Sequence, residues 1–592
     1  MMRRRYKQLS SSLFPFAKIR LFAALRTSFS EGYTRSDLRS DLMAGAVVAM
    51  VAIPLGMALA IASGVPPQYG LYTVIIGGGV VALLGGARFQ VTGPTAAFVV
   101  ILAPIAQKFG LGGLLVSGLM AGILLVIMGV ARMGRMIQFI PYPVTTGFTA
   151  GIAVVIATLQ LKDFFGLHVH EMPERFLEKV IVLFRAMETA SLSESLIGVS
   201  TLVFLIYWPK LNKRIPAPLV ALTAASVVTA FLKNRFPDLD ISTIGNRFSY
   251  ELSGVIGHGI PPTAPQFGLP WSFAGADGRP FQLTLETIES LVPSAFAIAM
   301  LGAIESLLSA VVADGMARTK HDPDAELVAL GAGNILCPFF GGIPATGAIA
   351  RTATNIRFGA RSPLSAIFHA LFSLIVVLVL APYVSYLPMA ALAALLMLVA
   401  YNMSEMKHFL HIIRVAPKSD VIVLLLCFSL TVIFDMVIGV TVGVVLASLL
   451  FMRRMATVTS THMVESSDHP QVRESLPRDI ILYEIAGPLF FGAAENAAEA
   501  ISGITDNVRA VIFSMDGVPV MDVTGLVAFE SAISKLSRHS RKVFLVGVKR
   551  QPHDLMTKDG FFDENPNVHI CDSVAEAVKA ATESLIKQNG ER

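Results

Sequence analysis

The feature that most constrains the fold is a long succession of apolar runs between Leu42 and Met452. A helix that spans a bilayer needs roughly 20 apolar residues, and we identify about fourteen segments of this kind. Charged residues make up only 15% of the chain, against about 25% in a typical soluble protein. The sequence therefore predicts an all-α polytopic domain that is embedded in a membrane.

These segments fall into two groups of seven. They begin near residues 42, 71, 94, 113, 142, 192 and 216, and again near residues 289, 326, 344, 362, 386, 420 and 436. The third segment of each group, which starts at Pro94 or Pro344, is too short to span a bilayer. The two prolines are 250 positions apart (344 − 94), and the same offset aligns other segments of the two groups. Because seven is odd, the halves must enter the membrane from opposite sides, which predicts a 7+7 inverted repeat.

The composition divides the chain into four parts. We expect a polar, basic N-terminal segment at 1–41, a transmembrane domain at 42–453, a linker at 454–476 and a soluble α/β domain at 477–592. In the last part, 480–485, 510–514 and 543–548 have the pattern of buried strands, whereas 526–536 and 574–586 have helical spacing. No signal-peptide pattern precedes the first apolar run. Three cysteines exclude a disulfide scaffold, and we expect reduced, buried thiols at Cys337, Cys427 and Cys571.

The basic residues predict the topology. Most of them fall in loops on the side of the N-terminus, including Arg132, Arg135, Lys210, Lys213, Arg214, Arg318, Lys320, Arg357, Arg361, Lys407, Arg414, Arg453 and Arg454. By the positive-inside rule that side is cytoplasmic, although the loop at 161–191 on the other side also carries basic residues. We therefore expect a multi-pass membrane protein with both termini in the cytoplasm. We attribute the net charge of +5 to the basic residues that set the membrane topology, and we expect no nucleic-acid partner.

Two half-length helices deep in a membrane imply a cavity, because irregular backbone is tolerated there only where protein or water surrounds it. Each half-helix is expected to begin at its proline, which suits the first helical position. The segments 93–97 and 343–347 would then direct free backbone N–H groups and the positive end of each helix dipole into one gap. An anion is the ligand expected in that gap. The alternative is a pair of ordinary spanning helices that are kinked by proline.

Glu305 is the only ionisable residue between Ala295 and Ala313. A charge at the centre of a bilayer costs at least about 3 kcal/mol, so such a residue is expected to face the protein interior and to have a function. Desolvation favours the protonated form of a carboxyl group, and we therefore expect Glu305 to couple transport to protons. The 250-residue offset pairs it with Leu55. The alternative is a permanently protonated carboxyl group bonded to a neighbouring carbonyl.

Four other side chains stand out. Arg351 and Thr524 each have two interpretations, whereas His369 and Asp435 have only a structural one. Arg351, seven residues after Pro344, could bind an anion or extend toward the cytoplasmic surface. His369 is expected to be a packing residue with satisfied hydrogen bonds, and Asp435 a turn residue. Thr524, in the segment 522–525 before a helix, is expected to cap that helix. The second interpretation of Thr524 is a phosphorylation site.

The sequence contains no Walker A loop, zinc-protease motif or nucleophile elbow. We therefore expect a protein that is not an enzyme, with no catalytic residue, no metal site and no cofactor.

The motifs together resemble the sulfate permease (SulP) family, bacterial relatives of solute-carrier family 26. The resemblance rests on 41–45, 53–58 and 66–72, on Gly93-Pro94-Thr95-Ala96, on 304–310, on Asn334 and on 340–347 with Ala350-Arg351-Thr352. The C-terminal part, with 486–491 and Asp522-Val523-Thr524-Gly525, resembles a STAS domain. The local sequence at 53–60, 160–164 and 429–435 is similar to that of enterobacterial members that import C4-dicarboxylates.

The resemblance implies a fourteen-helix inverted repeat with a core and a gate domain, usually dimeric, that moves anions by an elevator-like mechanism. It places the substrate between half-helices 3 and 10, at Thr95, Ala96, Ala345 and Thr346, and places the helix-8 carboxylate at Glu305. The sequence departs from the family pattern at Leu55, where most members have Gln, and at Asp324 and Leu330. The Leu55 departure puts a plain sulfate assignment in doubt.

The resulting prediction is a proton-coupled importer of C4-dicarboxylates such as succinate, fumarate and aspartate. Its expected partners are the anion, protons, membrane lipid, a second copy of the chain and a cytoplasmic protein bound by the STAS domain. One alternative keeps the fold and transports sulfate or bicarbonate, with sodium as a coupling ion for bicarbonate. The other alternative is an anion sensor that signals through the STAS domain.

Overall fold

A computed structural model describes most of the chain in two compact units, Met1–Val444 and Val445–Arg592. The described residues are 20–135, 141–169, 172–173, 175–212, 215–237, 239–252, 254–434, 436–458, 460–464, 476–477, 479–490, 508–538 and 541–590. Asp435, Lys213 and Arg214 lie outside these residues, as does much of the expected linker.

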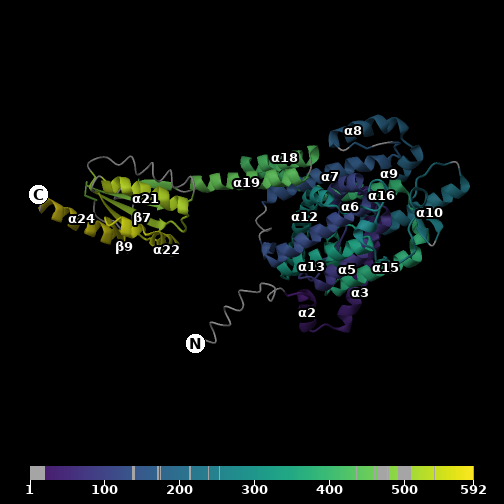
Figure 1. Ribbon diagram of the computed structural model, residues 1–592, viewed down its shortest axis with the longest axis horizontal. Helices are drawn as coiled ribbons and strands as arrows, with labels where there is room; N and C mark the ends of the chain where they lie inside the picture. The colour runs from purple at the N-terminus through teal and green to yellow at the C-terminus, as the bar shows by residue number, and fades with distance from the viewer. Residues whose placement is uncertain are drawn as a thin grey trace. The chain divides into compact units, whose positions relative to one another are not determined.

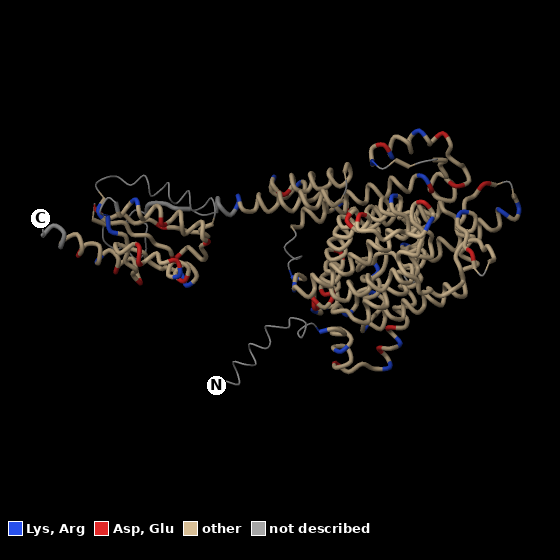
Figure 2. Tube along the Cα trace, viewed as in Figure 1, with Lys and Arg blue, Asp and Glu red and all other residues tan. Residues whose placement is uncertain are grey.

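The first unit is an α-helical bundle (Figure 1). Within the described residues, ten helical segments are long and apolar enough to cross a membrane: Arg35–Ala62 (α3), Pro67–Leu84 (α4, η2 and α5), Ala96–Val130 (α6), Tyr142–Phe164 (α7), Leu192–Leu211 (α9), Ala217–Arg235 (α10), Leu285–Ala317 (α12), Leu364–Val384 (α15), Met389–Val415 and Met436–Arg454. Most Lys, Arg, Asp and Glu positions along the backbone lie toward the periphery of this bundle (Figure 2). The expected all-α membrane domain is confirmed.

The difference between ten long segments and the expected fourteen has a structural explanation. The third and fourth expected segments are merged in α6, which is kinked at Gly110 (φ 70°, ψ −172°), a conformation that favours glycine. Three further expected segments are shorter helices, namely α13 (Pro323–Leu336), α14 (Ile349–Arg357) and α18 (Lys418–Ile433). Each expected segment therefore contains a helix.

Several elements of the first unit were not predicted. They are α2 (Ala23–Ser30), α8 (Phe176–Arg185), α17 (Met406–Val415), which follows α16 (Met389–Met403), and the hairpin of β2 (Ser249–Leu252) and β3 (Val255–His258). In addition, α3 begins at Arg35, ahead of the apolar run, because Thr34 and Asp37 form a capping box. The apolar pattern locates the buried part of α3 but not its first two turns.

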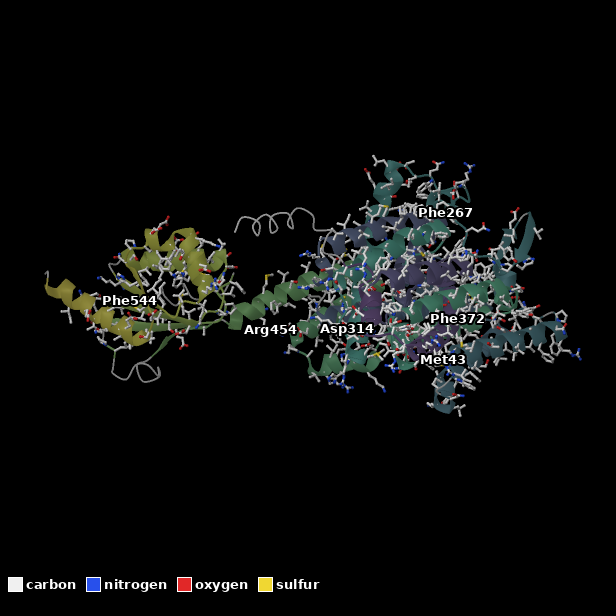
Figure 3. The ribbon with its side chains drawn as sticks, turned by 90° about the horizontal axis from the view of Figure 1, so that it is seen from below. Met43, Phe267, Asp314, Phe372, Arg454 and Phe544 are labelled. Carbon is white, nitrogen blue, oxygen red and sulfur yellow. The ribbon has the colours of Figure 1, made fainter. Side chains whose placement is uncertain are left out.

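Buried polar contacts join distant parts of the bundle. Asp41 in α3 is fully buried and accepts hydrogen bonds from the backbone N–H groups of Arg361 (2.6 Å) and Ser362 (3.1 Å), just before α15. The helices α3 and α15 pack side by side, and Figure 3 marks this pair with Met43 and Phe372. Such contacts satisfy the carboxylate and fix the helix ends to each other.

The second unit is an α/β domain built on one five-stranded sheet, in the order β5-β6-β7-β8-β9. The strands are β5 (Ser460–Val464), β6 (Ile480–Ala486), β7 (Ala510–Gly517), β8 (Lys542–Val546) and β9 (Val568–Cys571). β5 is antiparallel to β6 and the other pairs are parallel. The main helices are α21 (Val523–Arg538), α22 (Arg550–Asp559) and α24 (Val574–Gly590), and Figure 1 shows β7 between α21 and α24.

Alternation along the strands explains the layers of this domain. Val511 and Phe513 of β7 pack in one core with α21 and α22, whereas Ala510 and Ile512 pack in a second core with α24. The three strands and two helices that the sequence predicted are confirmed. β5 and β9 were not predicted, and β5 lies inside the expected linker.

The three cysteines are free and buried, as predicted.

Candidate anion site at the start of two opposed helices

Two short buried strands pair inside the membrane unit, and we call the place where they meet the crossing. β1 (Thr92–Gly93) pairs antiparallel with β4 (Thr346–Gly347), with Gly93 opposite Thr346. β1 leads into α6, and β4 leads into α14. The two helices therefore begin at the same crossing and leave it in opposite directions, as an inverted repeat requires.

The expected start of the second half-helix at Pro344 is wrong. α14 begins at Ile349, after Ala348, because the residues that follow Pro344 are held in extended conformation. Asn334 of α13 clamps Ala345: the Ala345 N–H donates to Asn334 Oδ1 (2.8 Å), and Asn334 Nδ2 donates to the Ala345 carbonyl (2.9 Å). Pro94 also precedes its helix, since α6 begins at Ala96 with Thr95 as the N-cap residue.

The 250-residue offset fails at this crossing. The two strands carry the same dipeptide, Thr92-Gly93 and Thr346-Gly347, at a separation of 254 (346 − 92). Aligning the prolines displaced the comparison by four residues (254 − 250). The pairing of Leu55 with Glu305 has no support from the strands, and Leu55 lies partly buried in α3.

Neither helix has a side-chain cap at this end. The first backbone N–H groups of a helix have no partner within the helix, and the helix dipole places partial positive charge at the same end. Two uncapped N-termini at one crossing are a favourable environment for an anion.

Arg351 is the third residue of α14, and its side chain is only 2% exposed. Its Nη2 donates to the Pro94 carbonyl (2.6 Å), which ties α14 to the start of α6. Its Nε and Nη1 are buried and have no hydrogen-bond partner among the described residues. Unpaired buried donors are costly, so these two nitrogens are available to an anionic ligand. The burial excludes the alternative in which Arg351 extends to the cytoplasmic surface.

Arg351 also explains a glycine of the motif. A Cβ added at Gly93 would lie 2.6 Å from Arg351 Nη1, which is closer than a side chain permits. Gly93 therefore allows the guanidinium to lie against β1.

Glu305 of α12 faces the same crossing. Its Oε2 accepts a hydrogen bond from Thr95 Oγ1 (2.8 Å), so its partner is a hydroxyl group and not a neighbouring carbonyl. Glu305 and Arg351 interact electrostatically, although they form no direct ion pair within the described part of the chain. The structure thus brings together Thr95, Glu305 and Arg351, with Ala96 in the first turn of α6.

Ala345 and Thr346 have a different arrangement from the one expected. Both are fully buried, and Thr346 Oγ1 donates to the Gly302 carbonyl of α12 (2.9 Å). The N–H and carbonyl groups of Ala345 are bound to Asn334. These groups hold β4 in place, so Ala345 and Thr346 frame the crossing without supplying the free helix N–H groups that we predicted.

A second carboxylate near the crossing was missed in the sequence. Glu326 of α13 is 1% exposed, and its Oε2 accepts from the N–H groups of Gly86 and Ala87 (both 2.9 Å). Its Oε1 accepts from Gln90 Nε2 (2.8 Å), and this same nitrogen donates to Ser306 Oγ (2.6 Å), next to Glu305. Glu326 stands close to Asp322 and Asp324 in the sequence, which made it look like an ordinary acidic residue at a helix start.

His369 is a packing residue of α15, but the expectation of satisfied hydrogen bonds is wrong. It is fully buried, and neither ring nitrogen has a hydrogen-bond partner among the described residues. The Arg351 guanidinium is close enough to act on His369 electrostatically, and sequence spacing along α15 could not reveal that neighbour.

In the α/β domain, Thr524 is not the helix cap. α21 begins at Val523, and Asp522 Oδ1 accepts from the Gly525 N–H (2.7 Å), so Asp522 supplies the cap. Thr524 is exposed in the first turn. Its phosphorylation remains a hypothesis.

Across the described residues, no group of three His, Cys, Asp or Glu side chains is placed to hold a metal ion.

Comparison with known proteins gives two family matches. Residues 38–427 match the Sulfate permease family, and residues 471–577 match the STAS domain. A Bacillus subtilis protein, YvdB, which is provisionally named a sulfate transporter, is 41% identical over 92% of this chain and 97% of its own. The bicarbonate transporter BicA of a Picosynechococcus strain is 28% identical over 92% of this chain and 95% of its own.

Solved structures agree with the architecture. The overall structure of SLC26A9 superimposes with a TM-score of 0.81 over 99% of this chain and 95% of that chain, at 17% identity. The transmembrane domain of a cyanobacterial BicA gives a TM-score of 0.58 over 70% of this chain and 98% of that chain, at 27% identity. The first of these likenesses bears on the fold alone.

Proposed function

Because this chain belongs to the sulfate permease family and ends in a STAS domain, we propose that it is a secondary active anion transporter whose substrate binds where α6 and α14 begin. The observation that carries the proposal is Arg351, with two unpaired buried nitrogens beside two uncapped helix N-termini. In this proposal Thr95 and Ala96 contact the anion, whereas Ala345 and Thr346 hold the opposite wall.

Glu305 supplies the coupling in the proposed mechanism. An anion that enters the crossing is attracted by Arg351 and repelled by an ionised Glu305, because both side chains face the same space. Protonation of Glu305 removes the repulsion, and its carboxyl group keeps the Thr95 hydroxyl as a hydrogen-bond partner. Anion and proton therefore bind together, and import strengthens as the outside pH falls.

The favoured cargo is a compact oxyanion, of which sulfate and bicarbonate are the two examples. The names of the relatives support this class. The geometry supports it as well, since the donors of α6, α14 and Arg351 converge at one place and suit a single anionic centre. Sodium remains a candidate coupling ion for bicarbonate.

C4-dicarboxylates are the second candidate cargo. The similarity of 53–60, 160–164 and 429–435 to dicarboxylate importers favours them, as does Leu55 in place of the usual Gln. A C4-dicarboxylate would place one carboxylate at Arg351 and would need a further donor for the other.

We place this multi-pass protein in a bacterial inner membrane, with the N-terminal segment at 1–41, the linker at 454–476 and the STAS domain at 477–592 on the cytoplasmic side. We also propose a homodimer, and a cytoplasmic protein partner for the STAS domain. Thr524, exposed at the start of α21, is the proposed phosphorylation site that regulates that partner.

The test of cargo is uptake into proteoliposomes that hold the full-length protein, with an inward proton gradient and labelled sulfate, bicarbonate or succinate. Gradient-driven sulfate or bicarbonate flux that succinate does not inhibit would support the compact oxyanion. Succinate flux blocked by fumarate but not by sulfate would support the second candidate. Absence of flux for all three anions would contradict transport of both classes.

Deletion of the residues after Ser460 separates transport from sensing. A transporter should keep measurable flux in a correctly inserted truncated protein, whereas a sensor should lose its downstream response. The truncated protein could also lose flux because it inserts incorrectly. Its orientation in the proteoliposomes is therefore measured along with its flux.

A further inference from the structure

The short helix α8, between α7 and α9, turns its most apolar face outward. Leu177, Val180, Ile181 and Phe184 follow the i, i+3, i+4, i+7 spacing of one helix face, and we call them the α8 stripe. All four are exposed, and Phe184 is 79% exposed. The one buried residue of α8 is Leu183. A helix on a soluble protein turns such a face to the core, so the α8 stripe requires another apolar surface.

The charged side chains of α8 lie away from the stripe. Glu178 and Arg185 are seven residues apart and form a second exposed line along the helix. Glu178 Oε1 pairs with Nη1 of Arg175, just before the helix, at 3.9 Å. Lys179 is on the side opposite the stripe and is partly buried. Separate apolar and charged faces of this kind are typical of helices that lie in the boundary region of a bilayer.

The lengths of α7 and α18 leave a space beside the end of α7. The two helices run side by side in the same direction, with Gly147 against Leu424 and Gly151 against Thr431. Past these contacts α7 continues for 13 residues to Phe164 (164 − 151), whereas α18 continues for only two (433 − 431). At a rise of about 1.5 Å per residue, α7 extends about 16 Å further than α18. The last turns of α7 therefore lie beyond the reach of α18.

α8 occupies this space. It packs against both α7 and α18, and Figure 1 shows it at the outer edge of the first unit, beyond the end of α18. Because α18 ends well before α7, the contact with α18 places part of α8 short of the level at which α7 ends. With 10 residues, α8 has about half the length that a spanning helix needs.

α9 shows which solvent surrounds this level. It begins where α7 ends, since the Ser191 N–H donates to the Phe165 carbonyl (2.9 Å). Leu192, Leu196 and Val199 are exposed on one face of α9, and α9 is long and apolar enough to cross a membrane. That exposed face faces lipid from its first turn onward. The α8 stripe lies at the same level as the start of this face.

From these relations we infer that α8 is a half-length helix embedded in the bilayer, and that the α8 stripe contacts the acyl chains of the leaflet in which α7 ends. The inference rests on the chain being a membrane protein and does not depend on the cargo or the coupling proposed above. The segment 161–191, which we predicted as a loop outside the membrane, then contains a lipid-contacting part of the transport domain. Through α8, the bilayer acts directly on the ends of α7 and α18.

The experiment uses nitroxide spin labels on the full-length protein in phospholipid nanodiscs. The three native cysteines are buried, so a thiol-reactive label should react with an introduced cysteine and little with the unchanged protein. Labels are placed at Phe184→Cys and Ile181→Cys on the stripe, with Glu178→Cys on the charged line of the same helix as the matched control. Power saturation then compares collisions of each label with oxygen, which concentrates among acyl chains, and with a water-soluble nickel chelate.

We expect the ratio of oxygen to nickel collisions to be higher at positions 181 and 184 than at position 178. The two stripe positions test the inference independently if one variant fails to fold. Preferential collision with nickel at both would place the stripe in water and overturn the inference. Shielding from both reagents, with broadening by the label of a second copy, would place the stripe in a protein interface and would overturn it as well.

Discussion

The hydroxyl of Thr95 donates a hydrogen bond to Oε2 of Glu305 at 2.8 Å, across 210 residues of sequence. This contact joins the N-cap residue of α6 to the middle of α12. It therefore links the group proposed to carry the proton to the helix end proposed to bind the anion. The contact explains why Thr95 does not cap its own helix, since its hydroxyl is directed to the carboxyl group.

Replacing Thr95 tests this link. Thr95→Val removes the hydroxyl while keeping the shape, and Thr95→Ser keeps the hydroxyl. We expect Val to lose one hydrogen bond of about 1 kcal/mol or more and to shift the pH dependence of uptake, because Glu305 loses a donor that favours its ionised form. The shift should be toward higher pH. Uptake measured against outside pH checks it, and a Ser variant with the Val profile would contradict the role of the hydroxyl.

Glu305→Gln should abolish the pH dependence of uptake. A carboxamide keeps the size of the side chain but carries no titratable proton, so anion flux should no longer rise as the outside pH falls. The matched control is Glu286→Gln, an exposed position near the start of the same helix, which should behave like the unchanged protein. Proteoliposome uptake over a range of outside pH values provides the measurement. If Glu305→Gln keeps both its rate and its pH profile, the coupling mechanism is wrong.

Arg351→Lys should fail to replace arginine. Lysine keeps the charge but lacks the planar fork that donates to the Pro94 carbonyl while leaving Nε and Nη1 free. We expect substrate affinity to fall at least about tenfold, the equivalent of one charge-assisted hydrogen bond. Arg357→Lys, which is exposed at the end of the same helix, serves as the control. Equal affinity in the two variants, measured by anion binding to purified protein, would remove Arg351 from the site.

Gly347→Ala should destabilise the membrane unit. A Cβ at this position would lie 2.5 Å from Gln90 Nε2 and 3.0 Å from the Ser306 Cα, so β4 or the Gln90 contacts must move. Overpacking of this kind costs roughly 1–3 kcal/mol. Thermal unfolding in nanodiscs measures the cost, with Gly315→Ala as the control because its Cβ would meet no atom within 4 Å. A Gly347 variant as stable as the control would show that the crossing is loosely packed.

Asp522 and Thr524 differ in what they do for α21. Asp522→Ala removes the carboxylate that accepts the Gly525 N–H and should cost about 1 kcal/mol of stability. Thr524→Ala should cost little, because Thr524 is exposed and is not the cap. Chemical unfolding followed by a probe in the α/β domain distinguishes the two. A larger loss for Thr524→Ala would restore the capping role that the sequence suggested.

The sequence by itself determined the division into an apolar helical part and a soluble α/β part. The reason is that the free energy of removing apolar surface from water depends on the composition of each segment. It also determined that Glu305 must face the interior, since one ionisable side chain in a long apolar run has few alternatives. The buried strands 480–485, 510–514 and 543–548 were predictable for the same reason.

Only the tertiary structure decided which groups meet at the crossing. Asn334 holds Ala345 in extended conformation and thereby moves the start of α14 to Ile349. The burial of Arg351 against Gly93 and the contact of Glu326 with Gln90 likewise depend on partners more than 200 positions away. Local hydrophobicity and helix propensity carry no information about such partners. They are fixed when the two halves of the chain pack around one crossing, because each buried polar group must then find a donor or acceptor there.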